Sequence, residues 1–206
     1  MKKVIMFFAF LFSILDINAY GVDLSHHNKV TDWDSITASF NLIKATEGST
    51  HVDSKCRDFV INANKRNIPV GVYHFMTTSS SAKSQFYHFY KHTKKLKTQL
   101  IPVLDIEKMT KGHLVSKKKL QNEVRVFVNL CKKYYGKTPI IYCSQHFYMK
   151  YFLGKFNDCM YWCGDVNYPA LISHVMHQKC VKKVPGIAGK VDYNVLNGNI
   201  KKIKLW

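Results

Sequence analysis

The chain has 206 residues, of which 47% are hydrophobic and 21% charged. This composition excludes a disordered chain and is sufficient for the core of one domain, or of two small ones at most. The formal net charge of +18 favours anionic partners: nucleic acid, anionic lipid or acidic wall polymers. Because no nucleic-acid recognition motif accompanies the charge, we do not expect nucleic acid to be the partner.

The N-terminus has the pattern of a secretory signal peptide. Lys2 and Lys3 precede an apolar stretch over residues 4–15, and the small residue Ala19 follows. The stretch is too short to span a bilayer, which needs about 20 apolar residues, and no other stretch is apolar enough to do so. We therefore expect residues 1–19 to be removed near Ala19 and the protein to be secreted, or periplasmic in a bacterium. An uncleaved, buried N-terminal segment is the alternative. Residues 20–206 would then form a single domain.

Short apolar runs alternate with amphipathic segments along the rest of the chain, which is typical of β/α units around a parallel sheet. In chain order, the expected strands cover residues 21–24, 41–45, 70–75, 101–106 and 139–143, with weaker candidates at 160–163, 175–177 and 191–196. The expected helices cover residues 53–66, with Asp53 or Ser54 as N-cap, 81–95, 116–135 and 144–153. Because the helical pattern fades after residue 154, we predict an α/β fold: an irregular, TIM-like (β/α) barrel with fewer than eight helices and a degenerate C-terminal half.

Six cysteines leave the redox state open. An even number in an exported chain permits disulfides, with about 15 possible full pairings. Cys56, Cys131 and Cys143 lie on apolar faces and could be buried thiols, whereas a bridge is more plausible among the later three, Cys159, Cys163 and Cys180. The spacing of Cys and His matches no metal-binding motif, and there is no glycine-rich phosphate loop or nucleophile elbow, so we expect neither metal nor cofactor.

The most informative segment is the run IPVLDIE over residues 101–107, where an apolar strand ends in two acids. Side chains of a strand alternate between faces, so Asp105 and Glu107 are expected to point the same way, with Cα atoms roughly 6.6 Å apart. Two carboxyl groups aimed together repel each other and resist burial. Side-by-side carboxyl groups suit acid/base attack on a glycosidic bond.

Other predicted strands also end in polar or aromatic residues, and the C-terminal ends of parallel barrel strands are where active sites collect. These residues are Asp23 with His26 and His27, Tyr73 with His74, Tyr142 with Ser144, and Asp192 with Asn194. Several of them have a plainer interpretation. Asp23 and Asp192 could be turn or cap residues, His74 could be a buried core histidine, and only one of His26 and His27 can face a pocket.

Six segments occur in an order that resembles glycoside hydrolase family 25, the Chalaropsis-type lysozymes or N-acetylmuramidases. They are GVDLSHH (21–27), IKATEG (43–48), GVYHF (71–75), PVLDIE (102–107), PIIY (139–142) and VPGIAGKVDYN (184–194). The resemblance spans the chain after the signal segment. It implies a barrel with fewer than eight helices and cleavage of the β-1,4 bond between N-acetylmuramic acid and N-acetylglucosamine in bacterial peptidoglycan. The protein would act as a monomer, and anionic wall polymers are further candidate partners.

The resemblance also implies roles for individual residues. Glu107 would be the general acid/base, Asp105 would stabilise positive charge or orient the substrate N-acetyl group, and Asp23 and Asp192 would flank them. The substrate-binding candidates are Tyr73, His74, Tyr142, Trp162, Gln178 and Asn194. Either an enzyme nucleophile or the substrate's acetamido group would give retained configuration, and the sequence does not choose between these routes.

The chain departs from the family pattern on its late strand. Residues 177–179 read His177, Gln178 and Lys179, where the family has Trp-Gln-Tyr, so that an aromatic pair is replaced by an imidazole and an ammonium group. Lys29 also replaces a usual glycine. These changes leave room for a peptidoglycan-binding protein with little or no activity. The net charge leaves a further alternative, a cationic antimicrobial or nucleic-acid-binding protein whose charge is responsible for its action.

Overall fold

The computed structural model describes residues 19–206, and the predicted signal segment therefore lies almost wholly outside the described residues. Eight strands form a closed barrel in the order β1, β3, β5, β6, β7, β8, β9 and β11, and a pairing between β1 and β3 completes the ring. Their bounds are β1 Tyr20–Leu24, β3 Phe40–Glu47, β5 Val70–Phe75, β6 Val103–Asp105, β7 Ile140–Cys143, β8 Tyr161–Cys163, β9 Met176–Lys182 and β11 Val191–Leu196. Neighbouring strands from β1 to β9 run parallel, whereas β11 is antiparallel to both of its neighbours.

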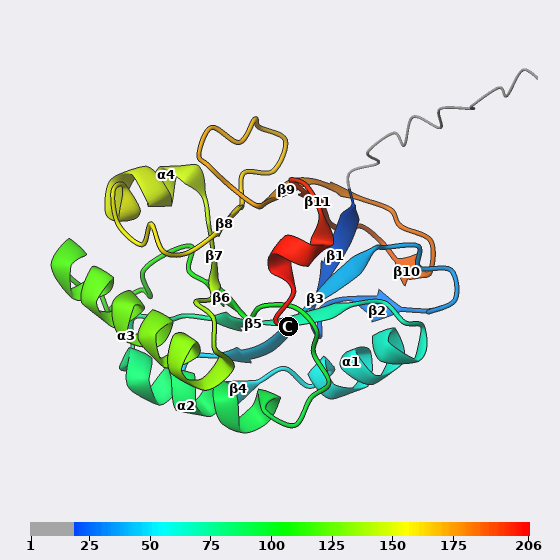
Figure 1. The fold of residues 1–206 in the computed structure, drawn as a ribbon, viewed down its shortest axis with the longest axis horizontal. Helices are drawn as coiled ribbons and strands as arrows, with labels where there is room; N and C mark the ends of the chain where they lie inside the picture. Colours follow the sequence, from blue (N-terminus) through cyan, green and yellow to red (C-terminus); the bar gives the residue numbers. More distant parts are fainter. Residues whose placement is uncertain (1–18) are drawn as a thin grey trace, which may run out of the picture.

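Helices cover only part of this barrel, which confirms the predicted fold class. They are α1 (Cys56–Lys65), α2 (Ala82–Thr93), α3 (Lys117–Tyr135) and the short α4 (Gln145–Phe147), which continues as a π-helical turn over Tyr148–Phe152. Figure 1 shows α1, α2 and α3 along one side of the barrel, while the C-terminal strands β9 and β11 lie away from them. Among the described residues, no α-helix follows α4, and a 3-10 turn over Ile200–Ile203 ends the chain.

Local sequence signals explain where most helices begin and end. Ser81 and Ser116 cap α2 and α3 by accepting hydrogen bonds from the backbone N–H groups of Ser84 and Lys119. Gly136 ends α3 with a positive φ of 77°, which glycine adopts without a steric cost.

The predicted start of α1 is wrong. The helix begins at Cys56, after an N-cap residue, Lys55, that has no side-chain cap bond. The Asp53 carboxylate is instead occupied by the N–H groups of Lys55 and His26 and by the His26 ring.

The structure adds short strands that the sequence did not indicate. β4 (His51–Val52) forms a hairpin with β3, and β2 (Lys29–Val30) pairs with β10 (Ile187–Ala188) in a separate two-stranded sheet. Conversely, β6 is shorter than predicted. It ends at Asp105, and the N–H group of Ile101 is bonded to the Ile203 carbonyl at the end of the chain rather than to a neighbouring barrel strand.

Alternation along the strands divides each barrel strand between two environments. On β3, Phe40 and Leu42 belong to the apolar cluster inside the barrel, whereas Ile43 and Ala45 pack in the layer beneath the helices. The interior is filled so closely that a Cβ atom on Gly21 would lie 2.2 Å from the Phe40 ring.

None of the helices among residues 19–206 has the length and apolar character needed to cross a membrane.

Candidate active site

A cavity of about 300 Å³ opens at the C-terminal ends of the parallel strands. The residues that line it lie on the same inward faces of the strands as the apolar cluster inside the barrel, nearer to the C-terminal ends of the strands. The lining residues are Asp23, Ser25, His27, Lys44, Tyr73, Phe75, Asp105, Glu107, Tyr142, Trp162, Gln178 and Asp192. Four of the 13 acidic residues of the chain therefore meet in one cavity of a strongly basic protein.

Asp105 and Glu107 both line this cavity. Asp105, the last residue of β6, is only 6% exposed, and its Oδ1 atom has no hydrogen-bond partner. Burial, with the nearby Glu107 carboxyl group second, holds the pKa of Asp105 well above its ordinary value. Glu107 lies two residues beyond the strand at the rim, where partial desolvation raises its pKa although the neighbouring Lys108 opposes this. A carboxyl group with a raised pKa can stay protonated and donate a proton.

Asp23 and Asp192 form the opposite wall. They are directly paired in the antiparallel register of β1 and β11. Burial, followed by the Asp192 charge, raises the pKa of Asp23 to about 7. The pKa of Asp192 is raised by desolvation.

A hydrogen-bonded chain holds Asp23 in place. The amide groups of Asn194 and Gln178 both donate to its Oδ2 atom, at 2.8 and 3.3 Å. The Tyr142 hydroxyl group in turn donates to Gln178 Oε1 at 2.7 Å. Because the side-chain oxygen of Gln178 accepts from Tyr142, the amide nitrogen of Gln178 is directed toward Asp23. This chain of hydrogen bonds connects Tyr142 on one wall of the cavity with Asp23 on the other.

Aromatic rings supply the remaining surface. Tyr73, Tyr142 and Trp162 line the cavity, and the rings of Tyr142 and Trp162 lie 4.5 Å apart. A Cβ atom on Gly164 would lie 2.7 Å from the Tyr142 ring, so glycine is needed there if Tyr142 is to keep its position. Aromatic faces beside carboxyl groups are suited to stacking on sugar rings.

The cavity also contains residues that the sequence analysis did not select: Ser25, Lys44 and Phe75. Lys44 Nζ lies 2.6 Å from Glu47 Oε2 and 5.0 Å from the centre of the Phe75 ring. Lys44 could have been found, because it is two residues beyond Leu42 on the inward face of β3. Only one of the two adjacent histidines faces the cavity, as expected, although their ring centres lie 3.8 Å apart. His27 lines the cavity, whereas His26 is bonded to Asp53.

His74 does not lie in the cavity, so the structure does not place it among the substrate-binding residues. It is 0% exposed, its ring nitrogens are within 2.8 Å of Thr46 Oγ1 and 3.1 Å of Gln85 Oε1, and it stacks on Phe127. The reason is strand alternation: Tyr73 points inward, so its neighbour must point toward α2 and α3. Asn194 is likewise fully buried and reaches the site only through Asp23.

His177 and Lys179, where the chain departs from the family pattern, do not line the acidic cavity. They face a separate hollow of about 520 Å³ beside the loop that contains Tyr168, while Gln178 between them points inward. The substitutions therefore leave the acid cluster intact.

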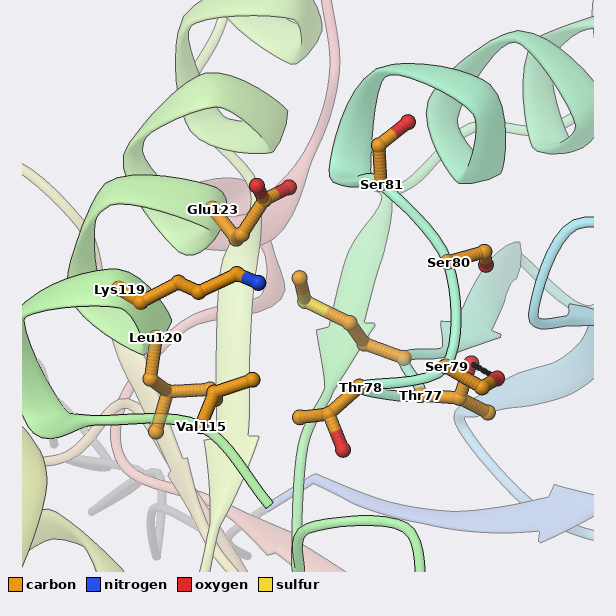
Figure 2. A pocket seen from close by; sticks show the side chains of 10 residues that line it. Thr77, Thr78, Ser79, Ser80, Ser81, Val115, Lys119, Leu120 and Glu123 are labelled. Carbon is orange, nitrogen blue, oxygen red and sulfur yellow. Dashed lines mark hydrogen bonds between the residues drawn. The ribbon is translucent and has the colours of Figure 1, made fainter. Parts of the chain in front are cut away.

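Another cavity, of about 230 Å³, lies between the loop before α2 and the N-terminal half of α3 (Figure 2). Its single carboxyl group belongs to Glu123, which accepts a hydrogen bond from the Ala82 N–H group at the start of α2. Without a pair of acids, this cavity lacks the arrangement that glycosidic cleavage needs.

The cysteines take no part in the site. All six lie within residues 19–206 and are unbonded in the structure, and five of them, all but Cys180, are buried. The five buried ones act as small core residues, and the disulfide that the sequence made plausible is not present among the described residues. Nor does this part of the chain hold any group of three His, Cys, Asp or Glu side chains arranged for a metal ion.

An acid pair beside aromatic rings at the C-terminal ends of barrel strands is the arrangement expected of a glycoside hydrolase. The sequence model of "Glycosyl hydrolases family 25" matches residues 22–178, and the chain belongs to this family.

Similar structures and sequences agree with this assignment. The solved structure of a family 25 glycosyl hydrolase from Bacillus anthracis is 30% identical, with a TM-score of 0.82 over 91% of this chain and 93% of that one. The bacterial lysozyme from Streptomyces coelicolor is 25% identical, with a TM-score of 0.81 over 90% and 95% of the two chains. The autolytic lysozyme of Clostridium acetobutylicum is 26% identical over 188 residues, which are 87% of this chain and 56% of that protein.

Proposed function

We propose that the protein is a lysozyme that hydrolyses the β-1,4 bond between N-acetylmuramic acid and N-acetylglucosamine in bacterial peptidoglycan. The observation that carries the proposal is the convergence of four acids on one cavity, with raised pKa values at Asp23, Asp105, Glu107 and Asp192. The names of the similar proteins from Streptomyces coelicolor and Clostridium acetobutylicum support the choice of substrate.

In this proposal Glu107 is the general acid. Its carboxyl group is at the rim, where a polymer bond can reach it, and its raised pKa favours the protonated form that donates to the leaving oxygen. After the C1–O bond breaks, the carboxylate accepts a proton from the incoming water.

Asp105 would assist from the cavity wall. Its buried Oδ1 atom lacks a donor, and a buried acceptor without a partner costs about 1–3 kcal/mol. The N–H group of a substrate acetamido group would supply that donor and would be oriented by it. Asp23 and Asp192 would add negative potential where positive charge develops on the sugar.

The test is digestion of purified peptidoglycan, followed by identification of the new reducing-end sugar. Muramic acid at that end supports the proposal, whereas glucosamine would mean that another bond is cut. Glu107→Gln should reduce the rate by at least about a thousandfold. Glu123→Gln makes the same chemical change in the other cavity and should keep full activity. If Glu107→Gln were as active as the wild type, Glu107 could not be the proton donor.

We further propose that the protein is exported, with cleavage near Ala19, and acts as a monomer on bacterial walls. N-terminal sequencing of the exported protein should begin at residue 20. A chain that keeps Lys2 and Lys3 in the exported fraction would contradict cleavage.

A further inference from the structure

The largest hollow described in the molecule, about 920 Å³, is not the acidic cavity but a groove between α1 and the C-terminal end of α2, which we term the α1–α2 groove. Both helices lie on the same side of the barrel in Figure 1. The floor of the groove is apolar, and its members are Ala45, Val52, Cys56, Val60, Ile61 and Leu96. Val52 and Ile61 are 38% and 41% exposed, which leaves apolar surface open to solvent.

Positive charge surrounds this floor. Arg57 and Lys65 extend from α1, and Lys91, Lys95 and Lys97 come from the end of α2 and the segment after it. All five are exposed, and none of them forms an ion pair within the described part of the chain. Their charges are therefore available to a ligand.

The groove has almost no negative charge of its own. Asp53 is its single acidic lining residue, and the side chain of Asp53 is 0% exposed and bonded to His26 and Lys55. The groove and the acidic cavity share no lining residue. Charge complementarity accordingly favours an anionic ligand in the groove, at a place separate from the acidic cavity.

An apolar floor beneath a cationic rim matches a molecule with an anionic head and an apolar chain. A polyanion such as nucleic acid or a wall polymer would use the rim alone and leave the floor exposed, which makes such a ligand the poorer match. We propose that the α1–α2 groove binds anionic phospholipid, with the acyl chain on the floor and the phosphate group at the rim. The inference does not depend on the reaction proposed for the acidic cavity.

The test uses vesicles of phosphatidylglycerol mixed with phosphatidylcholine, compared with phosphatidylcholine alone, and measures the fraction of protein that co-sediments. Wild-type protein should bind the anionic vesicles and not the neutral ones. Each lysine near an anionic membrane surface strengthens binding about fivefold. The double variant Lys91→Gln/Lys95→Gln should therefore weaken binding roughly 25-fold. Its matched control, Lys117→Gln/Lys118→Gln at the start of α3, removes the same charge outside the groove and should change binding less than twofold.

A second pair of variants tests the floor. Ile61→Ser should weaken vesicle binding at least threefold, and the loss should persist at high salt, where charge is screened. Val126→Ser on α3 is the control, since Val126 is 40% exposed and lies outside the groove. Equal losses in groove and control variants, or competition by a polyanion without any effect of Ile61→Ser, would overturn the proposal. Circular-dichroism spectra and thermal unfolding midpoints equal to those of the wild type would show that the variants are folded.

Discussion

Asp23 on β1 and Asp192 on β11 are direct partners in the antiparallel register that helps to close the barrel, and both line the cavity. Like charges directly opposite each other on paired strands destabilise a sheet. Burial and the Asp192 charge raise the pKa of Asp23 to about 7, so near neutral pH the pair carries less than two full negative charges. The repulsion that remains is the cost of placing two acids on one wall of the cavity.

This pair predicts how stability changes with pH. A folded pKa of about 7 against an ordinary value of 3.8 means that the folded protein binds more protons than the unfolded chain between these values. The free energy of unfolding should therefore fall as pH rises through this window and stay low above it. Asp192→Asn removes the neighbouring charge, so the pKa of Asp23 should fall. Above pH 7 the variant should be more stable than the wild type by on the order of 1 kcal/mol.

Urea denaturation across this pH range measures the effect. Asp58→Asn on the exposed side of α1 is the control, because it removes one acid far from the pair and should leave the pH profile of the wild type unchanged. An Asp192→Asn profile with the slope of the wild type would show that the two carboxyl groups do not interact.

Lys108 should set the upper limit of the active pH range. It lies next to Glu107, and its charge lowers the pKa of that carboxyl group against the effect of burial. Lys108→Gln should therefore raise the pKa of Glu107. Since a general acid must be protonated, the basic limb of the kcat/KM profile should move upward by a few tenths of a pH unit. Lys111→Gln, three residues further from the acid, should leave the limb in place, and a downward shift in Lys108→Gln would contradict the role of Glu107 as acid.

The Tyr142 hydroxyl group should matter for activity as well as for stability. Tyr142→Phe removes the hydrogen bond that orients Gln178 toward Asp23. A loss of about 1 kcal/mol should lower kcat fivefold to tenfold. Tyr161→Phe is the matched control, because its hydroxyl group donates to the Lys155 carbonyl at 3.0 Å outside the cavity. It should lose similar stability and keep its activity, so equal kcat values in the two variants would exclude the positioning role of Tyr142.

Strand alternation determines how much of this site could be predicted from sequence. Once one inward-facing residue of a strand is known, every second residue of that strand is expected to face inward as well. The sequence identified one such residue on each of four strands, and all four line the cavity: Asp23, Tyr73, Asp105 and Tyr142. The same rule would have removed His74, the neighbour of Tyr73, and would have added Lys44. Residue type does not separate these two cases, because a histidine and a lysine both suit a site, and it is their place on the strand that puts His74 outside the cavity and Lys44 inside it.

Other features depend on contacts between distant segments. Asp53 resembles a helix cap in sequence, but its carboxylate is bonded to His26, 27 residues earlier. The small sheet of β2 and β10 joins segments more than 150 residues apart, and each of its strands has only two residues. Strands of this length carry no periodic pattern, so only the folded chain shows them.

The excess of positive charge should make attack on whole cell walls sensitive to salt. The net charge of +18, which loses only one positive unit if Lys2, Lys3 and Asp16 are removed with the signal segment, attracts an anionic wall over a Debye length that shrinks from roughly 30 Å at 0.01 M salt to roughly 10 Å at 0.1 M. Lysis of intact walls should therefore fall several-fold over this range, because fewer molecules reach the surface. Hydrolysis of short, soluble peptidoglycan fragments is the control and should change much less, since each fragment carries few charges and does not present an extended anionic surface. Parallel rate measurements on the two substrates decide the matter: an equal decline would mean that salt acts on the cavity itself and that the surface charge does not guide the enzyme to the wall.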